Sequence, residues 1–319
     1  MPCVLPLACV CGLGRLNLER LFLSPFIRLK IVPRGRFMYS LFLRAYPRTI
    51  LRLVIISFLV LSRAAYLDAQ GIDPAPYVFV QKGNLPIIIS APHGGNDVIT
   101  GVPARTGVGV SDFVTVRDGG TEELAYALAT AIQQRFGKKP YVVASKASRL
   151  YVDLNRSAAN AYEHPDAQAV YEYYHNTMKL YSRTVANKFH GGLVIDLHGQ
   201  ATSSTTVFRG TRNGATVRHL RSAYGQSAHD GPNSLFGLLV TRGWVVDPPV
   251  LSATENTNFN GGYIVGTYGS QLATAVDAMQ FEFGSNYRGT STQRSQTAAD
   301  LTDALVTYAR LYLRVRVPN

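Results

Sequence analysis

Residues 85–97 read Leu-Pro-Ile-Ile-Ile-Ser-Ala-Pro-His-Gly-Gly-Asn-Asp, an apolar strand followed directly by a polar loop. The run 85–91 is short, continuous and rich in isoleucine, which is typical of a strand buried on both faces. It ends at Pro92 and His93, and two glycines follow. An imidazole at the end of a buried strand sits on rigid backbone, so this stretch indicates both a buried strand and a functional site.

Further along the chain, strand and helix patterns alternate. Three more apolar segments have the length of buried strands: 140–145, 192–197 and 278–283. Three longer segments repeat apolar residues at helical spacing: 121–136, 166–189 and 297–314. The stretch from about 200 to 270 is rich in Gly, Thr and Asn, and it predicts only short strands such as 235–240. The alternation predicts an α/β fold with a mixed, mostly parallel sheet and helices on both faces.

Charge separates an N-terminal extension (1–72) from a folded domain (73–319). The chain has a formal net charge of +12, but residues 1–70 hold 10 Lys/Arg against 2 Asp/Glu, which accounts for +8. The domain therefore carries little excess positive charge, and no basic, aromatic-rich stretch follows. This argues against nucleic acid as a partner.

The apolar run 53–61 follows the basic segment 44–52 and precedes small residues, which is the order of a signal peptide. It is too short to cross a bilayer, since a transmembrane helix needs about 20 apolar residues. We expect cleavage, secretion or entry into the secretory pathway, and no stable membrane span; a tilted signal anchor is the alternative. Met38 would be a more usual start for such a signal, so residues 1–37 are either a mispredicted extension or a targeting segment.

All three cysteines, Cys3, Cys9 and Cys11, lie in the first eleven residues. The domain therefore has no disulfide, thiolate ligand or cysteine nucleophile, and any metal must be held by His, Asp or Glu. His93 and His198 each end an apolar strand beside glycine. Two such imidazoles predict a catalytic zinc site, which commonly takes one carboxylate as its third protein ligand.

Other polar residues cluster beyond the predicted strands, and such strand ends meet at one edge of a parallel sheet. Four carboxylates are candidates for the third ligand: Asp97, Asp118, Glu122 and Glu123. Glu282 is the candidate general base, and Phe281 and Phe283 should point to the opposite face and leave it without near neighbours; the alternative is a structural carboxylate paired with an arginine.

The segment 148–156 offers groups that suit a substrate carboxylate. Arg149 and Arg156 have the fork geometry for it, and Asn155 could add an amide donor. The alternative for either arginine is an ion pair with Asp153 or Asp196. His229 in its Gly/Ser-rich loop is a weaker candidate for reaching the same site.

Six motifs in this order resemble the N-formylglutamate amidohydrolase family: Ser-Ala-Pro-His93-Gly-Gly, Arg-Asp118-Gly-Gly-Thr121, Ser148-Arg149-Leu-Tyr-Val-Asp153-Leu-Asn155-Arg156, Ile-Asp196-Leu-His198-Gly, Asn260-Gly261-Gly262-Tyr263 and Gln280-Phe-Glu282-Phe. The resemblance covers about residues 86 to 290. It implies a zinc carboxypeptidase-like fold and hydrolysis of an amide in an acidic N-acyl amino acid. It also implies one zinc on the two histidines and a carboxylate, a glutamate base, and an Asn-Arg pair on the substrate carboxylate.

The sequence departs from that pattern at two points. Carboxypeptidase-like proteins place an acidic ligand three residues after the first histidine, where this chain has Asn96, so Asp118 becomes the better third ligand. The bacterial enzymes of histidine breakdown act in the cytoplasm, so a signal peptide means that formylglutamate itself need not be the substrate. Two alternatives stay open: a secreted metallopeptidase acting on peptide or poly-γ-glutamyl termini, and a metal-free binding protein of the same fold.

Overall fold

The computed structural model describes residues 30–31, 37–38, 72–110, 112–252, 254–272 and 274–318. The chain divides into two units, Met1–Gln70 and Gly71–Asn319. In the first unit, the described residues form one antiparallel pair, β1 (Lys30–Ile31) with β2 (Phe37–Met38). The signal run at 53–61 lies outside the described residues, so the expected export stays a prediction. Among the helices that the structure describes, none combines the length and apolarity that a membrane crossing needs.

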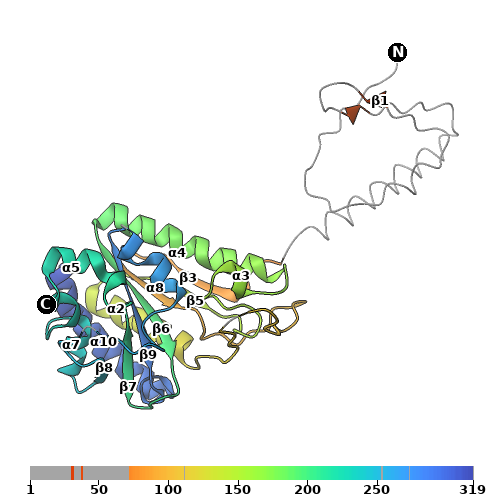
Figure 1. The fold of residues 1–319 in the computed structure, drawn as a ribbon. Coiled ribbons are helices and arrows are strands. Elements are labelled where there is room, and N and C mark those ends of the chain that lie inside the picture. Colours follow the sequence, from red (N-terminus) through yellow and green to blue (C-terminus); the bar gives the residue numbers. More distant parts are fainter. Residues whose placement is uncertain are drawn as a thin grey trace. The chain divides into compact units, whose positions relative to one another are not determined.

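A seven-stranded mixed sheet forms the centre of the second unit (Figure 1). Its strands, in spatial order, are β3 (Val78–Gln81), β5 (Tyr141–Ser145), β4 (Ile87–Ala91), β6 (Gly192–Gly199), β9 (Val276–Phe283), β7 (Thr206–Gly210) and β8 (Val245–Asp247). The neighbours β5, β4, β6 and β9 run parallel, as do β7 and β8. The pairs β3–β5 and β7–β9 are antiparallel. This confirms the expected mixed, mostly parallel sheet.

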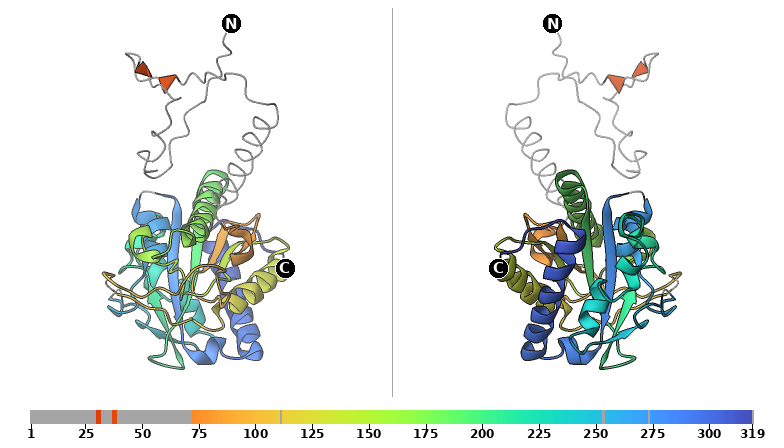
Figure 2. Two further views of the ribbon diagram at one scale, coloured as in Figure 1. Left: turned by 90° about the vertical axis from the view of Figure 1, so that its right-hand side faces the viewer. Right: turned by 90° about the vertical axis from the view of Figure 1, so that its left-hand side faces the viewer.

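Helices cover both faces of the sheet because successive strand residues point to opposite sides. On one face, Ile87 and Ile89 pack in a core with α2 (Thr121–Phe136), α7 (Leu235–Val240) and α10 (Ser291–Tyr312). On the other, Ile88 packs with α4 (Ala167–Phe189) and α8 (Tyr263–Tyr268). Figure 2 shows the sheet between these two layers. The remaining helical segments are η2 (Ala75–Tyr77), α3 (Ala158–Ala161), η3 (Ala215–Val217), α5 (Arg218–Tyr224), α6 (Ser227–Asp230), η4 (Ser270–Leu272) and α9 (Ser285–Arg288).

Most predicted elements lie where the periodicity of apolar residues indicated. Two predictions were wrong: the type of the element at 235–240 and the start of the last helix. The run 235–240, expected to be a strand, is helix α7, capped where the Ser234 hydroxyl accepts from the amide of Gly237. A short apolar run fits both periods, and the cap decides between them. Helix α10 begins at Ser291 rather than 297, because Thr290 and Gln293 form a capping box before the apolar stripe starts. Strands β3, β7 and β8 were not predicted.

Candidate active site

The parallel strands bring three candidate residues to one edge of the sheet. His93 follows β4, His198 lies near the end of β6, and Glu282 lies near the end of β9. His198 and Glu282 are register partners on adjacent parallel strands, so both side chains point to the face that α4 and α8 cover. Phe281 and Phe283 point to the opposite face and pack in its core.

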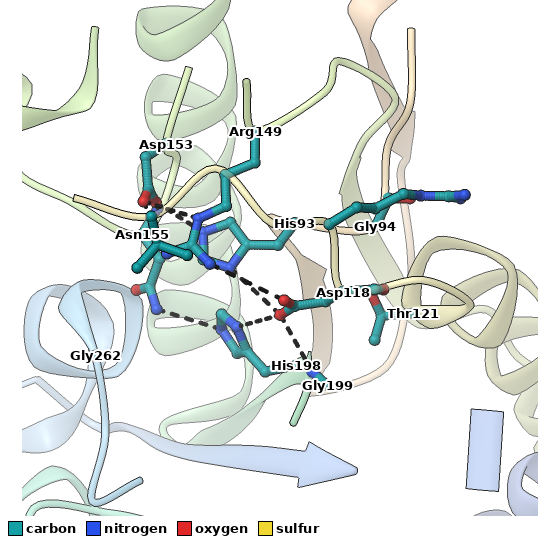
Figure 3. Close-up of polar contacts among 12 residues, drawn as sticks. His93, Gly94, Asp118, Thr121, Arg149, Asp153, Asn155, His198, Gly199 and Gly262 are labelled. Atoms are coloured by element: carbon teal, nitrogen blue, oxygen red, sulfur yellow. Dashed lines mark hydrogen bonds and ion pairs between the residues drawn. The ribbon is translucent and has the colours of Figure 1, made fainter. Parts of the chain in front are cut away.

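His93, Asp118 and His198 point toward one another and are buried (Figure 3). Their candidate ligand atoms all lie within 4.8 Å of one another. The Oδ2 atom of Asp118 is 3.2 Å from Nδ1 of His198 and 3.4 Å from Nδ1 of His93. The backbone holds Asp118 in place, since its amide donates to the carbonyl of His93 and its Oδ2 accepts from the amide of Gly199. This group could hold one metal ion.

The structure places Asp118, of the four carboxylates considered as third ligand, between the two imidazoles. Asn96, three residues after His93, is exposed. The other three carboxylates have partners elsewhere: Asp97 with Lys146 (3.7 Å), Glu122 with Tyr126 (2.7 Å) and Glu123 with Arg117 (3.2 Å).

Each imidazole also contacts a second, buried carboxylate. Nε2 of His93 is 2.7 Å from Asp153, and Nε2 of His198 is 2.9 Å from Asp196. These contacts favour a proton on each Nε2 and turn each Nδ1 toward Asp118. Carboxylates of this kind orient histidine ligands in metal sites. The sequence interpretation considered Asp153 and Asp196 only as ion-pair partners, although Asp196 precedes His198 by two residues and therefore shares its face of β6.

The charges in this group favour a cation between the three ligand atoms. Nδ1 of His93 is buried and has no hydrogen-bond partner in the described part of the chain. Burial opposes a positive charge on His198, but the carboxylates of Asp196 and Asp118 outweigh it and raise the pKa of His198 well above its ordinary value. Burial also acts to raise the pKa of Asp118, yet the two imidazoles hold it far below the ordinary range. Two imidazole nitrogens and a carboxylate oxygen this close together suit a divalent metal ion, which would displace any proton held between them.

Glu282 has a polar neighbour on its own face, which corrects the expectation that it stands alone there. Gln280 accepts from the amide of Gly262 through Oε1 (2.7 Å) and donates to Glu282 through Nε2 (2.8 Å). The amide of Gly262 thus decides which end of Gln280 faces the carboxylate. Burial raises the pKa of Glu282 to about 7, a value that suits a group that takes and returns a proton near neutral pH.

The two candidate arginines have different partners. Arg149 is buried, and its Nε and Nη2 donate to Oδ2 of Asp153 at 2.9 and 2.8 Å. For Arg149, the ion-pair alternative therefore applies. Arg156 is half-buried and donates to the carbonyls of Asn155 and Asp112 at 3.0 and 3.1 Å. Within the described residues it forms no ion pair with a carboxylate, so its charge is available to an anion.

Asn155 lies between the candidate metal group and the opposite wall of the cleft. Its Oδ1 accepts from the amide of Ile264, and its Nδ2 lies 3.4 Å from Nε2 of His198. A Cβ atom on Gly262 would lie 2.3 Å from this side-chain nitrogen, so the close approach requires glycine there. The amide oxygen is thus committed to α8, while the Nδ2 end faces the site (Figure 3).

One cleft of about 320 Å³ is lined by all seven of the main predicted site residues. Residues 258–262, from the Gly-, Thr- and Asn-rich region, form part of its wall, together with Val114 and residues 199–201. His229 is not among the lining residues; it is buried and contacts Thr211 at 2.8 Å. The seven predicted residues are His93, Asp118, Arg149, Asn155, Arg156, His198 and Glu282.

Fold and site together define an α/β protein with a buried His-Asp-His group that could hold one metal ion. No family model and no curated protein matches the chain. Among solved structures it is similar to an N-formylglutamate amidohydrolase from Ralstonia eutropha, at 14% identity and a TM-score of 0.49, over 75% of this chain and 98% of that one. It is also similar to a gene product from Agrobacterium tumefaciens, at 12% identity and a TM-score of 0.50, over 75% of this chain and 95% of that one. The second likeness, with a TM-score of 0.50, supports the α/β fold.

Proposed function

We propose that this protein is a zinc-dependent amidohydrolase that cleaves the amide bond of an acidic N-acyl amino acid. One observation carries the proposal: a buried His-Asp-His group and Glu282 line the same cleft as the half-buried Arg156. A metal group, a base and an anchoring cation in one small cleft are the parts that hydrolysis of a short acidic amide requires.

The site residues have three separate roles in the proposed reaction. His93, Asp118 and His198 would hold the zinc ion, which lowers the pKa of water and polarises a carbonyl group when bound. Glu282 takes a proton from the attacking water and gives it to the leaving amine. Arg156 holds the carboxylate of the substrate and so sets the amide against the metal group and the base.

A secreted metallopeptidase acting on peptide or poly-γ-glutamyl termini is the alternative within hydrolases. The cleft volume of about 320 Å³ favours a small substrate over a polypeptide. A catalytically inactive binding protein of the same fold is the alternative outside hydrolases, and it would not need the proton chemistry of Glu282.

We also propose that the protein is exported through the run at 53–61. N-terminal sequencing of the native protein tests this proposal, and an intact N-terminus on cytosolic protein would contradict it.

Hydrolysis of a panel of N-formyl-, N-acetyl- and γ-glutamyl-amino acids tests the proposed function. We expect turnover of acidic members, its loss with a chelator and its return with Zn²⁺. The same compounds with an amidated carboxylate are the matched control and should react poorly. Turnover that survives complete removal of metal would contradict metal dependence, and a zinc-loaded protein without turnover on any member would favour the binding protein.

Arg156→Lys should mainly raise KM for an acidic substrate, with a much smaller change in kcat. Lysine keeps the charge but loses the two-pronged hydrogen bonds, and a hydrogen bond to a charged group contributes about 1.5–3 kcal/mol. Arg156→Ala should raise KM by roughly 10- to 100-fold on that basis. Steady-state kinetics on the best acidic substrate and on its amidated analogue measure both.

The amidated substrate is the control for Arg156, since its reaction should be almost insensitive to the Arg156→Ala substitution. Arg149→Lys is a second control. Arg149 is paired with Asp153, which in turn contacts His93, so this substitution should change the position of His93 and leave KM nearly unchanged. Unchanged KM for the acidic substrate in Arg156→Ala would exclude Arg156 from carboxylate binding.

A further inference from the structure

Arg288, at the end of α9, donates hydrogen bonds to three backbone carbonyls on three different segments. Nε donates to Phe283 at 3.0 Å, Nη1 to Gly119 at 2.5 Å and Nη2 to Gln200 at 3.1 Å. Each of these segments carries one candidate site residue. Gly119 directly follows Asp118, Phe283 directly follows Glu282, and Gln200 lies two residues after His198.

Each of the three nitrogens of the Arg288 guanidinium group donates to one of these carbonyls. The group forms no ion pair with a carboxylate in the described residues, and it does not line the cleft. Its planar fork of donors can hold three acceptors in fixed directions at once, whereas a lysine ammonium is a compact charge on a flexible stem. A role in contacting the substrate therefore does not account for its position.

Two glycines leave room for Arg288, which is a second observation on the same contact. A Cβ atom on Gly199 would lie 2.4 Å from Nε and 2.5 Å from Cζ of Arg288. A Cβ atom on Gly120 would lie 2.1 Å from the carbonyl oxygen of Arg288, and Gly120 also has a φ of +88°. Larger residues at either position would push Arg288 away from the segments it joins.

We propose that Arg288 is the positioning residue that ties together the segments of Asp118, His198 and Glu282. It thereby sets the affinity of the His-Asp-His group for its metal and the place of the base beside it. The inference rests on the proposed function for the role of these three residues. It predicts a change in metal affinity and kcat with little change in KM, which is the opposite of the pattern expected for Arg156.

Cobalt binding tests this proposal, because Co²⁺ reports both the affinity and the ligand geometry through its visible absorption. We expect Arg288→Gln to raise the dissociation constant for Co²⁺ by about 10- to 100-fold, the usual effect of removing a group that orients metal ligands. Arg288→Lys should retain only a small part of the Co²⁺ affinity that Arg288→Gln loses. The cobalt spectrum should change in both variants, kcat should fall, and KM for the acidic substrate should stay within about twofold because the carboxylate contact is untouched.

Arg221→Lys is the matched control. Arg221 is also half-buried, and its guanidinium donates to Gln226 at 2.6 Å and to the carbonyl of Gly214 at 3.1 Å, away from the three site segments. The Arg221→Lys variant should keep the wild-type cobalt affinity and spectrum.

Chemical rescue gives a second test. Added guanidinium should recover part of the cobalt affinity of Arg288→Ala, whereas methylammonium, which has the charge without the planar fork of donors, should not.

The outcomes separate this inference from the proposed function. Arg288 variants with wild-type cobalt affinity and spectrum overturn the inference, even if their melting temperature falls, since Arg288 would then only stabilise the fold. If these variants do not fold, Gly199→Ala displaces the guanidinium group while Arg288 is retained, and unchanged cobalt binding there overturns it equally. A wild-type protein that binds no Co²⁺ would instead contradict the proposed function.

Discussion

Replacing His198 by alanine is expected to remove the bound metal and to lower kcat/KM by roughly 10³-fold or more, because a Lewis acid contributes several kcal/mol to such reactions. His93→Ala should have the same effect. Each substitution removes one of the two imidazoles of the His-Asp-His group and leaves a buried carboxylate, Asp196 or Asp153, without its imidazole partner. Elemental analysis of the purified variants, together with turnover on the best acyl-amino acid, measures the result.

His164→Ala is the matched control, since His164 lies outside the cleft and its nearest acid is Asp166 at 3.7 Å. It should keep both metal and activity. Circular dichroism must show that His93→Ala and His198→Ala still fold, because a buried carboxylate that loses its imidazole partner also destabilises the protein. A full complement of metal in either folded variant would show that the histidine concerned is not a ligand.

Glu282→Gln is expected to lower kcat by roughly 10²- to 10⁴-fold, the usual contribution of a positioned general base. Metal content and melting temperature should hardly change. The carboxamide oxygen has the shape and place of the lost carboxylate oxygen and can still accept the hydrogen bond from Gln280. Kinetics, elemental analysis and thermal melting of the same preparation separate a chemical role from a structural one, and a wild-type kcat would make Glu282 structural.

The pH dependence of kcat gives an independent check on Glu282. A general base acts only when ionised, so activity should fall as the pH drops through its pKa. Burial raises that pKa to about 7, and a bound cation acts in the opposite direction. The acidic limb of the wild-type profile should therefore lie at or below neutral pH, and Glu282→Gln should lack it. An identical limb in that variant would assign the titration to another group.

The sequence by itself determined the central part of the fold. Apolar runs, helical stripes and the polar residues after the strands were enough to predict β4, β5, β6, β9 and the helices α2 and α4. These features are local: burial on both faces selects continuous apolar strands, and amphipathic spacing selects helices. The same local signals were ambiguous at 235–240, where a short apolar run became α7, and weak at the edge strands β3, β7 and β8.

The sequence also determined which residue types meet at the site, because the carboxyl ends of parallel neighbours lie at one edge. Tertiary structure decided which atoms face one another there. It selected Asp118 among four carboxylates, paired Arg149 with Asp153 while leaving Arg156 without a carboxylate partner in the described residues, and turned Nε2 of Gln280 toward Glu282 through the contact of Gln280 with the amide of Gly262. Gln280 shares the face of Glu282 by the strand period alone, but the place of Asp118 between the two histidines and the contact with Gly262 depend on differences of a few ångströms between segments distant in the chain. Such distances follow from the paths of loops and the packing of whole elements, to which no local pattern of residues is sensitive.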